Sequence, residues 1–229
     1  MKILDWGRIS YTESSAKQLE LVDKVSSDLY CDQLIFCTHP PVVTVGRGTK
    51  AGDVFGWEGE IVETTRGGRA TYHGPSQLIA YPILNLNFSP YIVGTRDVHG
   101  IQFSPRDLHG YMRSLESAVV ETLHEFGIIG EARTLKAEAD VPSLTGVWVG
   151  EKKIASIGIA VKKWVTYHGI ALNVEDDQLA FSGINPCGFK STVMTSMAKV
   201  LGSESIDRFQ VRNTFESFLL KNLSRDNAS

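Results

Sequence analysis

The sequence predicts an α+β fold, in which helices flank a mixed, largely antiparallel sheet. Three segments carry apolar residues at helical spacing, near residues 12–29, 104–127 and 203–223. The segments between them are rich in Val, Ile and aromatic residues, which is typical of strands. Because the two kinds of segment do not alternate regularly, the pattern favours α+β over a doubly wound parallel sheet. No repeat or linker divides residues 1–229, so we expect a single domain.

The first helix is predicted from apolar residues that recur at helical spacing, namely Leu21, Val22, Val25 and Leu29. Thr12 and Ser14 precede them, and either side chain is suited to cap the first turn. Short strands are expected next, at residues 33–37 and 42–45.

The second helix has stronger boundary signals. Ser104 is the expected N-cap, Pro105 fits the first turn, and Gly127 is the expected stop. Between these ends the apolar residues form one stripe along the helix: Leu108, Met112, Leu115, Val119, Leu123 and Phe126.

The second half of the chain predicts more strands and one further helix. Strands are expected at residues 77–84, 146–149, 153–161 and 165–174. The last helix, from about residue 203, is expected to bury four residues and to fray after residue 223. These four are Phe209, Phe215, Phe218 and Leu219.

Composition excludes several classes of function. The net charge of -3 and the even mixture of charges argue against a general nucleic-acid or membrane binder. No apolar run is long enough for a signal peptide or a membrane span, so we expect a cytoplasmic protein. Cys31, Cys37 and Cys187 form no CxxC pair, which suits a reducing compartment. HExxH is also absent, so neither a metal nor another cofactor is expected.

Cys187 is the first candidate for chemistry, because Pro186 and Gly188 place its thiol on a tight turn. It could be a nucleophile or simply a small buried residue, since free cysteines are often buried. A thiol attacks as the thiolate and therefore needs a nearby cation or base. Lys153, His73 and His168 are the candidates, and residue chemistry alone favours a histidine.

Two further patterns indicate a binding pocket. Residues 66–69, Arg-Gly-Gly-Arg, combine exposable N–H groups with guanidinium groups and could hold an anion, although a solvated hairpin is the alternative. The sequence Thr-Tyr-His-Gly occurs at residues 71–74 and again at residues 166–169, in two predicted strands. This recurrence favours two strands that face one pocket, with His73 and His168 in it.

Several motifs in order resemble the lipoyl(octanoyl) transferases, over about residues 39–197. They are His39-Pro40-Pro41 with Thr44-Val45-Gly46-Arg47, Arg66-Gly67-Gly68-Arg69-Ala70-Thr71-Tyr72-His73-Gly74-Pro75, Lys153-Ile154-Ala155-Ser156-Ile157-Gly158, Tyr167-His168-Gly169-Ile170-Ala171-Leu172-Asn173-Val174 and Asn185-Pro186-Cys187-Gly188. The resemblance implies a fold like the catalytic core of biotin protein ligases and lipoate ligases. Arg69 departs from the family, which usually shows an uncharged residue such as glutamine there, and Ser76 replaces a common glycine.

The resemblance also assigns roles. Cys187 would form an acyl-thioester, Lys153 rather than a histidine would activate it, and His168 could support the site. The implied substrate pocket comprises Arg66, Gly67, Gly68, Arg69, Ala70, Thr71, Tyr72, His73, Ser156, Ile157, Gly158, Gly169, Ile170 and Ala171.

The implied reaction moves an octanoyl group from acyl carrier protein to a lysine of a lipoyl-domain protein, in lipoate biosynthesis. The acceptors would be apo lipoyl domains of 2-oxoacid dehydrogenase complexes and the glycine cleavage H protein, and we expect a monomer. Backbone N–H groups near the cysteine turn are the expected oxyanion donors. The alternatives are an ATP-dependent lipoate or biotin ligase, and a protein that stores an acyl group without turnover.

Two surfaces are expected to serve this reaction. Because an eight-carbon chain must leave water, an apolar tunnel is expected. Leu78, Ile157 and Ile159 are candidate walls, although ordinary core packing is the favoured role for each of them. A basic rim is expected to receive the acidic partner proteins. Its members would be Arg66, Arg69, Lys162, Lys163 and Lys190, although a solvated surface charge is an equal alternative for each.

Overall fold

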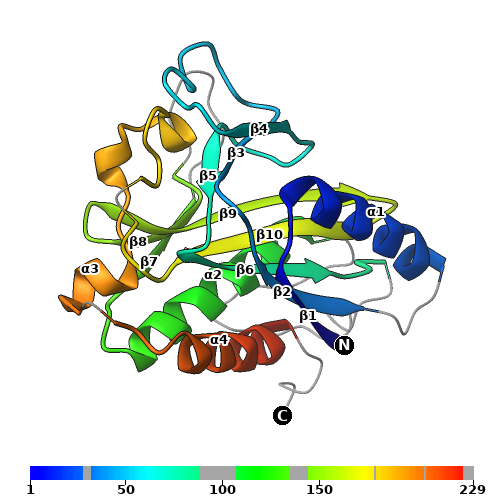
Figure 1. Cartoon of the computed structure of the whole chain (residues 1–229). Helices are drawn as coiled ribbons and strands as arrows, with labels where there is room; N and C mark the ends of the chain where they lie inside the picture. The colour runs from blue at the N-terminus through cyan, green and yellow to red at the C-terminus, as the bar shows by residue number, and fades with distance from the viewer. Residues whose placement is uncertain (28–31, 88–106, 135–143, 178, 204, 224–229) are drawn as a thin grey trace.

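The computed structural model describes residues 1–27, 32–87, 107–134, 144–177, 179–203 and 205–223. Figure 1 shows a central sheet with helices on both faces and a smaller sheet above one end. The larger sheet has seven strands in the order β1-β2-β6-β10-β9-β8-β7. The strands are β1 (Lys2–Arg8), β2 (Gln33–Thr38), β6 (Gln77–Ile83), β10 (Val165–Asn173), β9 (Lys152–Lys162), β8 (Gly146–Val149) and β7 (Glu131–Arg133).

The pairing in this sheet is mixed. β1 and β2 run parallel, and every other adjacent pair is antiparallel. The register between β8 and β9 shifts: Val147 pairs with Ala155, but Trp148 pairs with Lys153. One extra residue on β9, Ile154, therefore forms a β-bulge directly after Lys153.

The smaller sheet is formed by the part of the chain between β2 and β6. It consists of β3 (Val42–Val45) between β4 (Glu60–Glu63) and β5 (Thr71–His73). β3 is parallel to β4 and antiparallel to β5. Since β5 leads directly into β6, residues 66–73 are placed over one end of the larger sheet (Figure 1).

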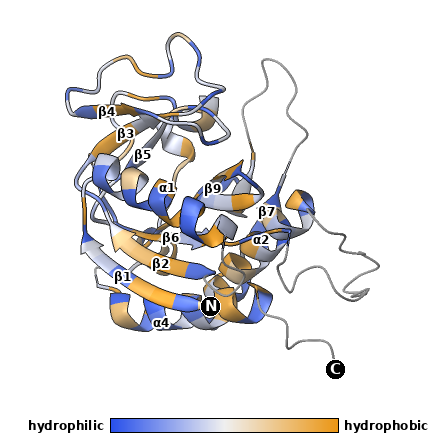
Figure 2. Ribbon diagram, turned by 90° about the vertical axis from the view of Figure 1, so that its right-hand side faces the viewer, coloured by the Kyte–Doolittle hydropathy of each residue, from blue (hydrophilic) through white to orange (hydrophobic). Residues whose placement is uncertain are grey.

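Two apolar cores lie on opposite faces of the larger sheet, because alternate residues of a strand point to opposite faces. On one face, helices α2 (Leu108–Glu125) and α4 (Arg208–Leu223) cover residues such as Phe36. On the other, helix α1 (Tyr11–Ser27) covers residues such as Ile35. In Figure 2, β2 is largely hydrophobic, whereas the visible side of α1 is largely hydrophilic.

The α+β layout agrees with the sequence prediction, but several details differ. β1, β4 and β7 were not predicted, because short and largely exposed strands lack a full apolar alternation. The first helix is capped by Ser10, whose Oγ accepts from Glu13 N at 3.2 Å, rather than by Thr12 or Ser14.

The later helices also differ from the prediction. α2 begins at Leu108, with Asp107 as its N-cap, whereas Ser104 and Pro105 lie outside the described residues. Gly127 ends it with a positive φ of 73°, as predicted. A short helix, α3 (Met197–Leu201), precedes α4, and Phe209 is 72% exposed rather than buried. None of the helices in the described residues is both long and apolar enough to cross a bilayer.

Candidate active site

Cys187 lies in a tight turn that two loops hold in place. Its backbone has φ 55° and ψ 17°, a left-handed conformation that is uncommon for a residue with a Cβ. Cys187 N donates to Ala70 O at 2.9 Å, and Asn185 N donates to Asp53 O at 2.8 Å. Such a backbone persists only where the surroundings fix it, and here both neighbouring loops do so.

Lys153 meets Cys187 across the end of β9. Its Nζ lies 3.3 Å from Cys187 Sγ, and the two residues are 1% and 8% exposed. The indole ring of Trp148 lies 5.8 Å from the same Nζ. A buried amine in contact with a buried thiol can exchange a proton with it and stabilise the thiolate.

Cys187 opens onto a narrow pocket between β9, β10 and residues 66–73. Its volume is about 40 Å³, which leaves room for only a few water molecules. The lining residues are Tyr11, Arg66, Gly67, Gly68, Thr71, His73, Ile79, Tyr81, Thr145, Ser156, Ile157, Gly158, His168, Gly169, Ile170, Ala171 and Cys187.

Most of the expected substrate residues line this pocket, but three do not. Arg69 forms an ion pair with the buried Asp53, and its guanidinium occupies the space where a Cβ of Gly188 would lie. Ala70 is buried behind the cysteine turn and accepts its N–H bond. The Tyr72 hydroxyl donates to Asp177 at 2.9 Å, away from the pocket.

Four lining residues were missed from the sequence: Tyr11, Ile79, Tyr81 and Thr145. Tyr11 opens the first helix and has no local pattern that marks it. Of the three candidate apolar walls, only Ile157 lines the pocket, and all three, Leu78, Ile157 and Ile159, contact the core beneath α2 and α4.

Arg66 is buried in the wall of the pocket with 6% exposure. Its Nε and Nη2 donate to Thr44 Oγ1 at 3.2 and 2.7 Å, and Nη2 also donates to Thr44 O at 2.8 Å. Its Nη1 donates to Gly67 O at 3.0 Å. Burial lowers the pKa of Arg66, while the nearby charges of Tyr11 and Cys187 act in the opposite direction.

Histidines and tyrosines form the inner end of the pocket. The ring of Tyr11 lies nearly parallel to those of His73 and His168, at centroid distances of 5.6 and 6.3 Å. Tyr11 Oη lies 3.3 Å from His168 Nδ1, and His168 Nε2 has no partner within the described residues. Burial, followed by the positive charge of Arg66, lowers the pKa of His168 to about 3.

His39 and His73 are also held neutral in this cluster. Burial lowers the pKa of both, most strongly for His73. His39 is fully buried, with Nδ1 2.8 Å from Ile9 O and Nε2 2.7 Å from Tyr81 Oη. A neutral imidazole fits this pair of contacts, since it donates at one nitrogen and accepts at the other.

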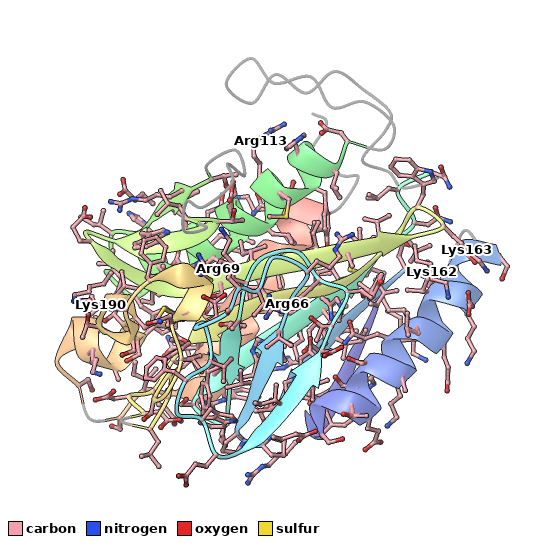
Figure 3. The ribbon with its side chains drawn as sticks, turned by 90° about the horizontal axis from the view of Figure 1, so that it is seen from above. Arg66, Arg69, Arg113, Lys162, Lys163 and Lys190 are labelled. Carbon is pink, nitrogen blue, oxygen red and sulfur yellow. The ribbon has the colours of Figure 1, made fainter. Side chains whose placement is uncertain are left out.

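The structure limits two expectations about charge. The N–H groups of Cys187, Gly188 and Phe189 all donate to backbone carbonyls, so these three N–H groups of the turn are already engaged. The five basic residues also do not form one rim. Lys162 and Lys163 contact Asp23 near α1, far from Lys190, and Arg66 lies inside (Figure 3).

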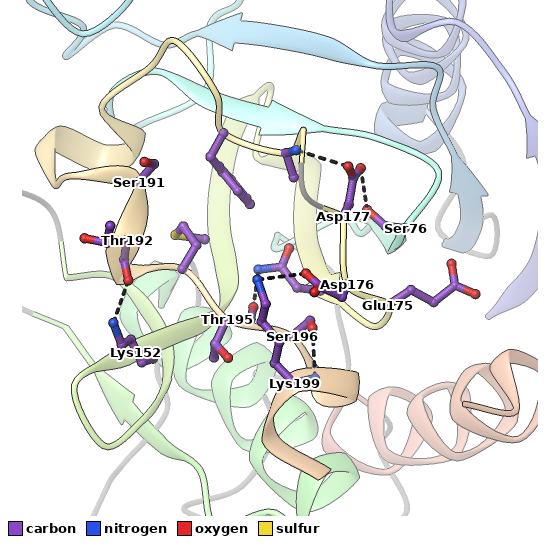
Figure 4. A pocket seen from close by; sticks show the side chains of 14 residues that line it. Ser76, Lys152, Glu175, Asp176, Asp177, Ser191, Thr192, Thr195, Ser196 and Lys199 are labelled. Carbon is purple, nitrogen blue, oxygen red and sulfur yellow. Dashed lines mark hydrogen bonds and ion pairs between the residues drawn. The ribbon is translucent and has the colours of Figure 1, made fainter. Parts of the chain in front are cut away.

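A larger cleft of about 410 Å³ lies on the other side of β9 (Figure 4). Lys152 lines this cleft and donates to Thr192 O at 2.7 Å, whereas Lys153 is not among its lining residues. The three carboxylates in its wall are already paired: Glu175 with Arg208, Asp176 with Lys199, and Asp177 with Ser76. The cleft and the Cys187 pocket share no lining residue, so the two are separate.

Known proteins resemble the chain over most of its length. A family model described as the lipoyl protein ligase A/B catalytic domain matches residues 10–219. The octanoyltransferase of Bdellovibrio bacteriovorus is 48% identical over 205 residues, which cover 87% of this chain and 89% of that protein.

Solved structures share the fold. A bi-partite lipoate protein ligase from Thermoplasma acidophilum has a TM-score of 0.66 at 18% identity, covering 97% of this chain and 83% of that chain. Biotin protein ligase from Aquifex aeolicus has a TM-score of 0.53 at 14% identity, covering 97% and 68%. At such identities the likeness concerns the fold alone, and it confirms the predicted fold, which resembles the lipoate- and biotin-ligase cores.

Proposed function

This chain belongs to the lipoyl protein ligase A/B catalytic domain family, and from that premise we propose that it is an octanoyltransferase of lipoate biosynthesis with Cys187 as its acyl carrier. One observation carries the assignment of Cys187: its Sγ, which lines the pocket, lies 3.3 Å from Lys153 Nζ, and both residues are buried. An ATP-dependent ligase has no need of such a pair.

In the first half-reaction, the Cys187 thiolate attacks the thioester carbonyl of octanoyl-acyl carrier protein. The sulfur electron pair forms the new C–S bond, and the carbonyl π pair moves to oxygen. When the intermediate collapses, the carrier thiolate leaves and takes a proton from the Lys153 ammonium. The donor thioester already carries the activation, so the step needs no ATP.

In the second half-reaction, the amine of a lipoyl-domain lysine attacks the thioester on Cys187. Lys153, now neutral, takes the proton that this amine loses, and the Cys187 thiolate leaves. The product is an octanoyl amide on the acceptor protein. The acceptors we propose are lipoyl domains of 2-oxoacid dehydrogenase complexes and the glycine cleavage H protein.

The acyl chain is proposed to extend into the pocket from Cys187. Each buried methylene contributes ~0.8 kcal/mol, so several of them supply useful binding energy. The residues proposed to contact it or its thioester are Arg66, Gly67, Gly68, Thr71, His73, Ser156, Ile157, Gly158, His168, Gly169, Ile170 and Ala171.

Intact mass spectrometry after incubation with octanoyl-acyl carrier protein tests this function. We expect a hydroxylamine-sensitive octanoyl adduct on the wild type, none on Cys187→Ser, and slow formation on Lys153→Ala. Cys37→Ala is the matched control, because it removes the other described cysteine, which is buried and whose thiol pKa burial raises. An adduct that survives Cys187→Ser would overturn the assignment.

Transfer to an apo lipoyl domain is then measured with and without ATP. We expect many turnovers without ATP. A strict requirement for ATP would favour the ligase, and a single acylation without turnover would favour an acyl-storage protein.

A further inference from the structure

We propose that Arg66 is a catalytic cation, whose guanidinium stabilises the negative charge that forms first on the Cys187 sulfur and then on the carbonyl oxygen of the substrate. The role of Arg66 toward the sulfur stands without the proposed function. Its role toward the oxygen rests on that function, because it assumes an acyl group on Cys187.

Arg66 carries a buried positive charge without a carboxylate partner. Among the described residues, no carboxylate forms an ion pair with Arg66, and its contacts are the neutral oxygens of Thr44, Gly67 and Tyr11. A buried charge is costly unless an opposite charge or good hydrogen bonds compensate it. The ionisable groups that act on its charge are Tyr11, Cys187 and Tyr81. Burial raises the pKa of both tyrosines, so the Cys187 thiolate is the anion that meets the positive field of Arg66.

The fold leaves space for this guanidinium at two glycines. A Cβ on Gly46 would lie 2.9 Å from Arg66 Nη1 and, closer still, 2.6 Å from Gly68 O. A Cβ on Gly158 would lie 3.3 Å from Arg66 Cδ, so the arginine would have to shift by a few tenths of an ångström. The lack of side chains at Gly46 and Gly158 therefore fits the arginine in its present position.

The donors of the cysteine turn itself are already engaged. An acyl transfer needs stabilisation of the oxyanion, and preorganised donors usually provide it. The N–H groups of Cys187, Gly188 and Phe189 are bonded elsewhere. Arg66 lines the same pocket as Cys187, and its positive charge can stabilise an oxyanion that forms there.

The charges then balance through the reaction. While the sulfur is ionised, the Lys153 ammonium compensates it and Arg66 adds a further attraction. After the C–S bond forms, the negative charge lies on the carbonyl oxygen, where Arg66 stabilises it. The same positive field disfavours an incoming lysine as the ammonium and favours the neutral amine that can attack.

Two alkylating reagents test the charge without any acyl donor. Iodoacetate is an anion and iodoacetamide is neutral, so the ratio of their rates at Cys187 reports the field in the pocket. We expect Arg66→Gln to lower this ratio about tenfold, because a unit charge is removed from a site of low dielectric constant. A merely structural change would alter both rates together.

Lys190→Gln is the matched control. It removes the same charge three residues from Cys187, but at an exposed position where water and salt screen it. We expect its ratio to equal that of the wild type. A ratio within about twofold of wild type for Arg66→Gln, or an equal fall for Lys190→Gln, would contradict the proposal.

Arg66→Lys gives a second test that does not depend on the folding of Arg66→Gln. It keeps the charge but loses the guanidinium donors, so the alkylation ratio is expected to persist while acylation by an octanoyl thioester slows about tenfold or more. A higher KM with unchanged kcat would mean that Arg66 only binds substrate, and it would refute the catalytic role. Absence of any acyl transfer, with the alkylation ratio still dependent on Arg66, would instead refute the proposed function.

Discussion

Acid should destabilise this protein through its buried histidines, and the size of the effect follows from their surroundings. His168 and His73 are 4% and 8% exposed, and burial lowers the pKa of each. In the unfolded chain both would titrate near ~6.5. At pH values between the lowered pKa of the folded state and the pKa of the unfolded state, the unfolded state binds more protons. The free energy of unfolding therefore falls as the pH falls.

The magnitude can be worked out for a change from pH 7.5 to pH 5. An imidazole with an unfolded pKa of ~6.5 that stays neutral when folded loses about 2 kcal/mol of stabilisation over this range. His168, whose folded pKa is about 3, and His73 together give about 4 kcal/mol. His39 acts in the same direction, whereas Glu116, whose pKa burial raises, offsets part of the loss.

Urea unfolding at constant ionic strength, followed by tryptophan fluorescence, measures this loss. The slope of unfolding free energy against pH should approach about two protons near pH 5. His168→Asn removes one titrating group and suits the left-handed backbone of φ 59°, so it should lower the slope by about one proton.

His109→Gln, at an exposed position on α2, is the control and should leave the slope unchanged. If the wild type takes up less than about one proton on unfolding between pH 6 and pH 5, the histidines are not neutral in the folded state and the claim is refuted.

Two further predictions concern stability, and both are measured by urea unfolding at pH 7.5. Phe215 is fully buried on the inner side of α4, whereas Phe209 is 72% exposed on the same helix. Phe215→Ala should therefore lower the free energy of unfolding by about 3–5 kcal/mol, and Phe209→Ala by less than about 0.5 kcal/mol. Equal effects would mean that the helix is rotated from the described packing. Asp107 Oδ1 accepts from Gly110 N at 2.7 Å, so Asp107→Ala should cost about 1 kcal/mol, whereas no change would indicate that this cap is not formed in solution.

The sequence predicts those elements whose own residues carry a complete pattern. β10 is buried throughout and rich in β-branched residues, and the stripe through Leu115 and Val119 specifies α2. β1 was missed because its pairing with β2, rather than an apolar face, holds it in the sheet. Local patterns do not report such tertiary pairing.

The site was predictable only in part for a related reason. Cys187 and Lys153 lie 34 positions apart, and nothing in either local sequence indicates that their side chains meet. Residue chemistry favoured a histidine, but His73 and His168 are engaged with Gln77 and Tyr11 instead. The sequence also could not show that the Cys187 N–H group is already hydrogen-bonded, because its acceptor, Ala70 O, comes from a distant segment.

The bulge after Lys153 has a consequence for the identity of the amine beside the thiol. Lys152 and Lys153 are chemically equivalent neighbours, yet one faces the open cleft and the other faces Cys187. Successive side chains on a strand point to opposite sides, so a slip of β9 by one residue would exchange the two amines. Strand register, and not any difference between the two side chains, therefore selects which lysine can take part in chemistry.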